Sequence, residues 1–478
     1  MYLPLDATGT RYAQLARALK QAILEGRLVP GSKLPSTRAL AEDTGLSRNT
    51  VLLAYELLRA ERLGVARAGS GTYVTDAKPL PATPALALAP TDVAPQSAYA
   101  TRLRTLGPVV LAGGPSHRLR YDLQYGAPLL NPPLVNAWST ALARAALRTD
   151  TRYPPAQGLA SLRQAICHFL ARWRGVVAQP QDVVIVSGAQ QALSLVARIV
   201  LDAGATAAIE DPHYQLAAHA LRAHGADVAS VPTDAQGLVV DALPPAARLV
   251  HVTPSHQFPS GRVMSLERRM ALLQFAAQRD AWIFEDDYDG ELSDDASSSP
   301  ALRALDRHDR VVYVGSFSKM MFPSLRLGYV VCPRGLRDDL VAAKQMDDLG
   351  SGAIEQAAMA SLFDKGAFER HLRLAVGELR KRRGALLAGL ARHAGDHIQV
   401  ADSRRGMHVV GWLPHWDDAR LAALIEVART QGVGLHSIRP HYRTPPPQPG
   451  LLLGFAGLSP RQLEAATKVL GQCLRDAR

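Results

Sequence analysis

The chain has 478 residues, more than one compact domain usually contains, so we expect two or more domains. Its 47% hydrophobic and 20% charged residues are typical of a folded globular protein, and its net charge of +11 is compatible with an anionic partner such as nucleic acid. The three cysteines lack C-x-x-C spacing, the first residues lack a signal segment, and no apolar run reaches roughly 18 residues, so we expect no disulfide framework, no metal cluster, no membrane contact and a cytoplasmic location.

Three regions of different composition follow one another. Residues 1–76 indicate short helices closed by a small hairpin. Residues 77–120 contain many prolines and show no strong period, which predicts a semi-rigid linker. From 121 to 478, short apolar runs alternate with helical stretches, which predicts an α/β domain with a mostly parallel central sheet.

The first region has the order helix, helix-turn-helix, hairpin. Leu15, Leu19 and Ile23 share one face of an amphipathic helix, and Ser36 and Ser47 are typical N-caps of two further short helices. Two short helices across a tight turn form a helix-turn-helix, whose second helix enters the major groove of DNA. The alternative interpretation is a small helical oligomerisation domain with surface arginines.

The second of these short helices begins with side chains that can bond base edges and phosphates: Ser47, Arg48, Asn49 and Thr50. The run LPSTRALAEDTGLSRNTVLLAYELLRAERL, followed by ARAGSGTYV, resembles the GntR-type winged helix over its whole length. The resemblance implies that Arg38, Arg48, Asn49, Thr50 and the wing residue Gly69 contact double-stranded operator DNA. It departs from the family at Arg62, where a glycine is usual between the recognition helix and the first wing strand.

In the third region, GSFSKMMFPSLRLGY (315–329) places Lys319 just after a predicted strand. A lysine that forms a Schiff base must be neutral enough to attack an aldehyde. Ser316, Ser318 and Arg326 beside it suit a phosphate dianion. On this motif alone, a surface lysine in a loop explains the pattern equally well.

A second motif, WIFEDDYDGE (282–291), ends a predicted strand in carboxylates. Asp286 suits the partner of a protonated pyridine nitrogen, and Tyr288 could hydrogen-bond the 3-oxygen of such a ring. Acidic strand ends also bind Mg²⁺, but the phosphate-type motif nearby favours pyridoxal phosphate.

Three further motifs suit the same ligand. VSGAQQAL (186–193) presents the free N–H groups of a helix that starts near Ala189 and Gln190 to an anion. Tyr214 in IEDPHYQ follows a strand and could stack on a ring, and Tyr153 in TRYPPAQ precedes a helix. Taken singly, each of these is also compatible with an ordinary turn or with packing.

Together these motifs resemble fold-type I aminotransferases across residues 121–478, and with HVTPSHQFPSGRVMSLERRMALL (251–273) they are similar to the MocR subfamily of GntR regulators. The resemblance implies that Lys319 binds pyridoxal 5'-phosphate covalently and that Asp286, Tyr288 and Tyr214 contact its ring. It also implies a homodimer with shared sites, in which Tyr153 reaches the phosphate in the neighbouring subunit. The residues that it assigns to the phosphate within one subunit are Ala189, Gln190, Ser316, Ser318 and Arg326.

The C-terminal run LLLGFAGL (451–458) lacks the arginine with which aminotransferases hold the substrate carboxylate. Arg439 and Arg443 are candidate replacements, and His256 or Gln257 stands where those enzymes place an asparagine near the ring. We therefore expect a bacterial transcription regulator that responds to a small amine or amino acid, or to pyridoxal phosphate itself. The alternatives are a working aminotransferase with an attached DNA-binding domain, a regulator that has lost the cofactor, and a purely structural oligomerisation module.

Overall fold

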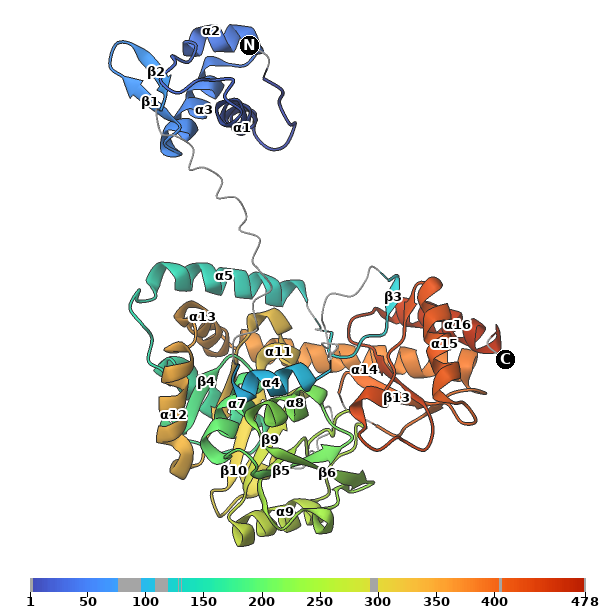
Figure 1. Ribbon diagram of the computed structural model, residues 1–478. Coiled ribbons are helices and arrows are strands. Elements are labelled where there is room, and N and C mark those ends of the chain that lie inside the picture. The colour runs from blue at the N-terminus through green and yellow to red at the C-terminus, as the bar shows by residue number, and fades with distance from the viewer. Residues whose placement is uncertain are drawn as a thin grey trace. The chain divides into compact units, whose positions relative to one another are not determined.

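The computed structural model describes residues 3–75, 96–107, 119–127, 129, 131–292, 300–403 and 406–476. The chain divides into two compact units, Met1–Pro95 and Gln96–Arg478 (Figure 1). None of the helices in the described ranges is long and apolar enough to cross a membrane. The three cysteines are buried and free.

The small unit is a winged helix-turn-helix, as predicted. Its elements are α1 (Arg11–Leu24), α2 (Thr37–Thr44), α3 (Arg48–Ala60) and the antiparallel hairpin β1 (Gly64–Arg67) and β2 (Gly71–Val74). Ser36 Oγ accepts from the backbone N of Ala39 and Ser47 Oγ from that of Thr50, each at 3.1 Å, so both expected caps start their helices. Apolar side chains of the three helices and of β2 form one core.

The predicted linker is interrupted by a helix, α4 (Ala98–Thr105). This helix belongs to the larger unit, because Arg102 Nε donates to the carbonyl oxygen of Ala223 at 2.9 Å and Tyr99 packs on His224 with ring centroids 5.6 Å apart. The expected boundary at residue 120 is therefore too late for this stretch. Residues 77–95 and 108–118 of the predicted linker lie outside the described residues.

The large unit is built on an eight-stranded, mostly parallel sheet in the order β4-β11-β10-β9-β8-β5-β6-β7, in which β11 and β7 run antiparallel to their neighbours. Every apolar run that predicted a strand forms one. The strands are β4 (Val183–Val186), β5 (Thr206–Asp211), β6 (Asp227–Asp234), β7 (Gly237–Leu238), β8 (Ala247–Val252), β9 (Trp282–Asp287), β10 (Val311–Ser316) and β11 (Gly328–Val331).

Helices cover both faces of this sheet (Figure 1). Side chains at alternate positions of β4 enter different cores: Val184 and Val186 pack with α7, α8 and α12, whereas Val183 and Ile185 pack with α5, α6, α13 and α14. The sheet is thus buried on both sides, as its continuous apolar runs require. The helices of this unit after α4 are α5 (Pro132–Arg148), α6 (Ala160–Trp173), α7 (Ala189–Val200), α8 (Gln215–His224), α9 (Leu266–Arg279), α10 (Leu302–Leu305), α11 (Phe317–Met320), α12 (Arg334–Asp348), α13 (Ala353–Asp364), α14 (Ala367–Ala394), α15 (Asp418–Thr430) and α16 (Pro460–Asp476).

Two smaller sheets complete the large unit. One has the order β12-β13-β15, and in the other β14 pairs with β3. Their bounds are β3 (Tyr121–Asp122), β12 (Gln399–Val400), β13 (His408–Trp412), β14 (Val433–Gly434) and β15 (Gly450–Gly454). The mostly parallel sheet buried between helices is the α/β architecture that the sequence predicted.

Candidate functional site

The main candidate site lies at the carboxyl ends of the parallel neighbours β9 and β10. Asp286 pairs with Val314 in the register of these strands, and Lys319 lies in α11, directly after β10. The ends of parallel strands meet at one edge of the sheet, where open α/β folds bind ligands. Lys319 Nζ is 3.4 Å from the carbonyl oxygen of Gly126, and burial lowers the pKa of its amine.

Asp286 is a buried carboxyl without a matched partner. Burial, together with the nearby carboxylates Asp287 and Asp289, raises its pKa to about 7, while the charge of Lys319 opposes this shift. Its Oδ1 is buried and has no hydrogen-bond partner among the residues that the structure describes. His251 Nε2 lies 3.9 Å from Oδ2, and burial lowers the pKa of that imidazole to about 3, so His251 is neutral. We call the buried surroundings shared by Lys319 and Asp286 the Lys319 pocket. These surroundings disfavour the negative charge of Asp286 unless a cationic or N–H-bearing group joins it.

A cup suited to an anion forms beside these residues, between β4 and α7. Gly188 is the N-cap of α7 with φ 100, and no side chain caps this helix. A Cβ at Gly188 would lie 3.2 Å from the guanidinium of Arg326, which also donates to the carbonyl oxygen of Ser187. We call the Ser187–Gly188 turn, the first turn of α7 and the Arg326 guanidinium the anion cup. Its free N–H groups and its fixed positive charge favour a phosphate.

The other residues predicted for the cup or its surroundings are placed as follows. Ser316 Oγ accepts from the backbone N of Ser318 at 3.2 Å, which orients the turn that carries Lys319. Ala189 is the first residue of α7, and the side chain of Gln190 donates to the carbonyl oxygen of Leu216 at 3.3 Å.

Aromatic side chains flank the same pocket. Tyr214 is half-buried; burial and the nearby Asp286 raise its pKa to about 12. The hydroxyl of Tyr288 lies 2.8 Å from His256 Nδ1, and the same nitrogen lies 2.9 Å from Asp289 Oδ2. His256 Nε2 is buried and finds no partner within the described part of the chain, so His256 retains a polar atom for a ligand.

Gln257, the alternative to His256, has its amide engaged by its own loop and by Pro212. The amide nitrogen donates to the carbonyl oxygens of Pro212 and Phe258, and the amide oxygen accepts from Ser260. Of the two residues considered for the position of the missing asparagine, His256 is therefore the one with capacity for a ligand.

For three further predicted residues, no contact with Lys319 is found in the described ranges. Arg439 lines a different pocket of about 410 Å³, where its Nε lies 3.7 Å from Asp418 Oδ2. Arg443 is exposed, and its backbone N donates to Asp211 Oδ1 at 2.9 Å. Tyr153 is 83% exposed, at a third place, a pocket of about 810 Å³ lined by α5 and α13.

Sequence reasoning missed several residues that shape the Lys319 pocket. His251 lies on β8, inside a run that was interpreted only as a buried strand. Tyr125 packs on Phe258 with ring centroids 5.3 Å apart and on His441 at 5.7 Å. His408 is buried, and this burial lowers its pKa to about 3. The nearby charge of Lys319 also lowers the pKa of His408. His251 could have been identified as a histidine in an otherwise apolar strand. No feature of the sequence pointed to Tyr125 or His408.

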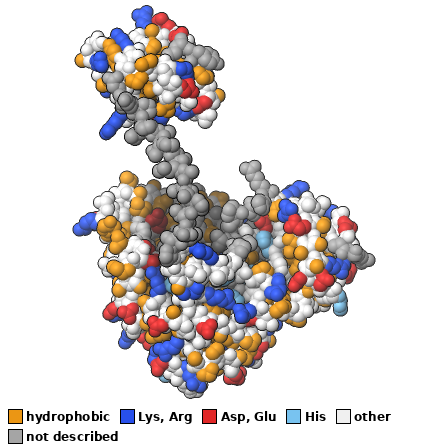
Figure 2. Space-filling view, in the orientation of Figure 1, with side chains coloured by type: hydrophobic (Ala, Val, Ile, Leu, Met, Phe, Trp, Pro, Cys, Tyr) orange, Lys and Arg blue, Asp and Glu red, His pale blue; other side chains and the backbone are white. Residues whose placement is uncertain are grey.

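In the small unit, the predicted DNA contacts lie around the start of α3. Arg48 and Asn49 are exposed, and the side chain of Arg38 is 85% exposed with a 3.3 Å contact to Glu42. Ser47 Oγ is occupied as a cap and lies 2.9 Å from Thr50 Oγ1. In the view of Figure 2, basic side chains project from this unit among acidic and apolar ones.

The hairpin of the small unit has the shape of a wing. Gly69 adopts φ 69 in the turn between β1 and β2, and the Arg67 guanidinium lies 4.4 Å from the Tyr73 ring centroid. Arg62, which departs from the family pattern, has φ 58, a left-handed conformation that favours glycine. The backbone at Arg62 therefore has the conformation that a glycine at this position would favour.

Comparisons with known proteins agree with both units. The family described as aminotransferase class I and II matches residues 122–470, and the one described as bacterial regulatory proteins, gntR family, matches residues 11–74. The chain is 33% identical over 476 residues to the probable rhizopine catabolism regulatory protein MocR of Rhizobium meliloti, covering 97% of this chain and 93% of that protein. It is 38% identical over 340 residues to the HTH-type transcriptional regulator TauR of Rhodobacter capsulatus, covering 70% and 69%.

Among solved structures, the chain is similar to the α-aminoadipate aminotransferase LysN from Thermus thermophilus, with 30% identity, a TM-score of 0.66 and coverage of 74% of this chain and 92% of that one. Fold and comparisons together define a DNA-binding transcription regulator with an aminotransferase-like domain. Three curated relatives that match 96–97% of the chain carry the names of regulators. The chain belongs to the MocR-type regulators of the GntR family.

Proposed function

We propose that this regulator binds pyridoxal phosphate at Lys319. Its affinity for operator DNA changes in response to an amine or amino-acid effector, or to the cofactor itself. The observation that carries the proposal is the buried, unpartnered Oδ1 of Asp286, in the same pocket as the buried Lys319 amine. A protonated ring nitrogen would satisfy this oxygen and relieve the charge penalty of the pocket.

The residues present fit this cofactor. The anion cup would hold its phosphate, Tyr214 would stack on its ring, and the hydroxyl of Tyr288 would meet its 3-oxygen. Bound pyridoxal phosphate supplies an aldehyde that an amine can attack and a ring that accepts electrons. Burial lowers the pKa of Lys319, which increases the fraction of neutral, nucleophilic amine. LysN, which was solved with N-(5'-phosphopyridoxyl)-L-leucine, supports the same choice of ligand.

A homodimer acting in the bacterial cytoplasm is part of the proposal. Tyr153 is 83% exposed, and the neighbouring Leu147 on α5 is 87% exposed, so this face leaves large apolar side chains uncovered. A second copy of the chain would bury them and would bring Tyr153 to the partner's phosphate. Two winged helices per dimer then predict paired half-sites on the DNA.

The competing function is that of a working aminotransferase. Against it, the C-terminal run of the chain has no arginine to hold the substrate carboxylate. Strand β15 contains only glycine and leucine, and Arg439 lies in the pocket beside Asp418 instead of near Lys319. Efficient transamination needs the amino acid held in one orientation. Multiple turnover with an amino acid and a keto acid would establish this rival.

The experiment is the absorption spectrum of purified full-length protein, for wild type and Lys319→Ala, before and after a panel of amines. The proposal expects a visible cofactor band in wild type, its loss or shift in Lys319→Ala, and a change with one amine. Wild type that shows no band even after pyridoxal phosphate is added would overturn it, and the DNA-binding role would remain.

A further inference from the structure

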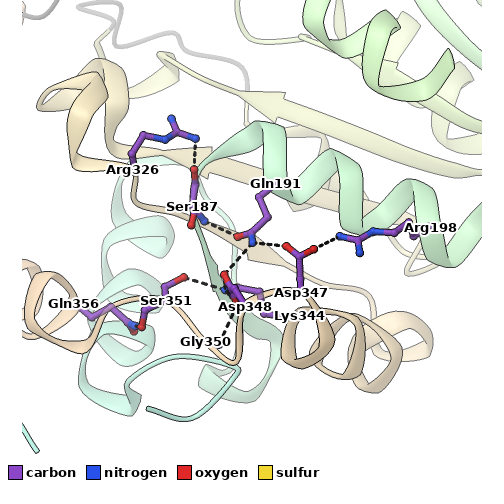
Figure 3. Close-up of polar contacts among 10 residues, drawn as sticks. All are labelled: Ser187, Gln191, Arg198, Arg326, Lys344, Asp347, Asp348, Gly350, Ser351 and Gln356. Carbon is purple, nitrogen blue, oxygen red and sulfur yellow. Dashed lines mark hydrogen bonds and ion pairs between the residues drawn. The ribbon is translucent and has the colours of Figure 1, made fainter. Parts of the chain in front are cut away.

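Gln191, in the first turn of α7, joins the anion cup to two carboxylates of α12. Its Oε1 accepts from the backbone N of Ser187 at 2.8 Å, and its Nε2 donates to Asp347 Oδ2 at 2.7 Å and to Asp348 Oδ2 at 3.0 Å (Figure 3). The amide of Gln191 therefore bonds the turn of the cup on one side and the end of α12, a helix distant in the sequence, on the other.

The bonds continue beyond Asp348 through fully buried side chains. Lys344 Nζ donates to Asp348 Oδ2 at 2.5 Å and to Ser351 Oγ at 3.0 Å (Figure 3). Gln356 Nε2 donates to the carbonyl oxygen of Ser351 at 2.8 Å. Lys344 and Gln356 have no solvent-exposed surface, so the bonds from Lys344 to Ser351 and from Gln356 to Ser351 are shielded from water, whereas the side chain of Asp348 is 28% exposed.

The far end of this chain of bonds is the segment that follows Tyr153. The backbone N of Leu159 donates to Gln356 Oε1 at 2.8 Å. A Cβ at Gly350 would lie 3.2 Å from the carbonyl oxygen of Pro155, so the junction of α12 and α13 also touches this segment directly. We call residues 153–159 the Tyr153 segment.

Ser187 is the residue at which a ligand in the anion cup can alter this series of hydrogen bonds. Its carbonyl oxygen accepts from Arg326 while its N–H donates to Gln191, so the same residue is held from both sides. A phosphate in the anion cup would compete for the Arg326 guanidinium, giving this turn a second arrangement. Coupling between sites requires an element with two arrangements that both sites bias.

We propose that Gln191 is a positioning residue that couples phosphate occupancy of the anion cup to the Tyr153 segment. The inference rests on the proposed function, in which the cup takes the cofactor phosphate and Tyr153 serves the partner subunit's site. Filling one site of the dimer then changes the geometry offered to the other, and cofactor binding is cooperative.

The test is hydrogen exchange of the full-length protein with and without pyridoxal phosphate, for wild type, Gln356→Leu, Gln191→Met and Arg198→Gln. Gln356→Leu breaks the far end of the chain of bonds and leaves the cup intact. Gln191→Met breaks the near end at a partly exposed position, so it remains informative if the buried substitution prevents folding. Arg198→Gln is the matched control, because it removes a 2.7 Å contact to Asp347 without touching Ser187.

In wild type and Arg198→Gln, the cofactor should slow exchange about twofold or more in both the cup and the Tyr153 segment. In Gln356→Leu, protection should remain in the cup and disappear from the segment. Gln191→Met should lose the protection of the Tyr153 segment and should bind the cofactor roughly two- to tenfold more weakly. Equal protection of the segment in all four proteins, or protection of the wild-type cup alone, would overturn the inference while the proposed function stands. No cofactor binding by wild type would overturn both.

Discussion

The Lys319 pocket and the start of helix α3 differ in how far their polar side chains are exposed to solvent. In the pocket, Lys319 and Asp286 are removed from water and their pKa values move toward neutrality, because the surrounding protein disfavours their charges. At the start of α3, Arg48 and Asn49 lie in solvent. Burial tunes chemistry in one place, and exposure keeps donors available for a large partner in the other.

This contrast predicts different responses to substitution. Changes in the pocket should alter titration and cofactor affinity, because each group there acts on its buried neighbours. Changes at the exposed surface should alter DNA affinity with little effect on stability.

The largest expected effect tests whether burial controls titration. Burial raises the pKa of Glu210 to about 7, while Thr253 donates to its Oε2 from both the backbone N and Oγ1. The cofactor-free folded chain keeps a proton that the unfolded chain releases above its ordinary pKa of 4.5. This contribution to stability is present below pH 4.5 and is lost as the pH rises through 7. Between pH 5 and 7, Glu210→Gln should lose less unfolding free energy than wild type, by about 2–3 kcal/mol.

Chemical denaturation of the cofactor-free large unit at the two pH values measures this difference. Glu267→Gln, an exposed change at the start of α9, is the control and should follow wild type. Parallel curves for wild type and Glu210→Gln would show that Glu210 is ionised in the fold.

The second test removes the charge partner proposed for the cofactor ring. Asp286→Asn keeps the size of the side chain, so the unliganded protein should be no less stable above pH 7, where wild type carries a disfavoured charge. Affinity for pyridoxal phosphate should fall by about 2 kcal/mol, roughly 30-fold, because a charge-assisted hydrogen bond is lost. A spectroscopic titration measures it, with exposed Asp227→Ala as the control. Unchanged affinity would remove Asp286 from the cofactor site.

The third test addresses the exposed surface. Asn49→Ala should weaken binding to a selected DNA site by about 1–2 kcal/mol, and Arg48→Ala should also reduce the salt dependence if it contacts phosphate. Neither should change the melting temperature, since both side chains are exposed. Arg59→Ala, in the last turn of the same helix, is the control for charge. Quantitative gel shifts at several salt concentrations distinguish these outcomes, and wild-type binding by Asn49→Ala would place recognition elsewhere.

The smallest effect concerns backbone strain. Arg62 holds φ 58 with its side chain exposed, so Arg62→Gly should stabilise the small unit by about 0.5–1 kcal/mol. Thermal unfolding of the winged helix checks the sign. A destabilised variant would mean that the Arg62 side chain makes a contact that outweighs the strain.

Local patterns in the sequence predicted the parts of the fold that depend on local interactions. The continuous apolar runs of the central sheet and the capping serines Ser36 and Ser47 were found because each signal lies within a few residues of its effect. Helix α4 was missed because its short sequence has a weak apolar face and it packs through Arg102 on a helix more than a hundred residues away.

The site shows the same division. The placement of Lys319 and Asp286 at the ends of neighbouring strands follows from their motifs, whereas their role in cofactor binding stays a prediction. The role of Gln191 could not be found in this way, because its partners on α12 lie more than 150 residues further along the chain. Arg439 lines another pocket, because sequence proximity to β15 does not determine which pocket a side chain enters.

The most direct test of the account is the DNA affinity of one protein in three states. A DNA site selected by full-length wild type from a random library is titrated with cofactor-free, cofactor-loaded and amine-treated protein, with Lys319→Ala beside it. The account predicts paired half-sites, affinities that differ at least about fivefold between states, and no response in Lys319→Ala. Identical affinities in all three states of wild type would contradict it, because the large unit would then bind its ligand without regulating DNA binding.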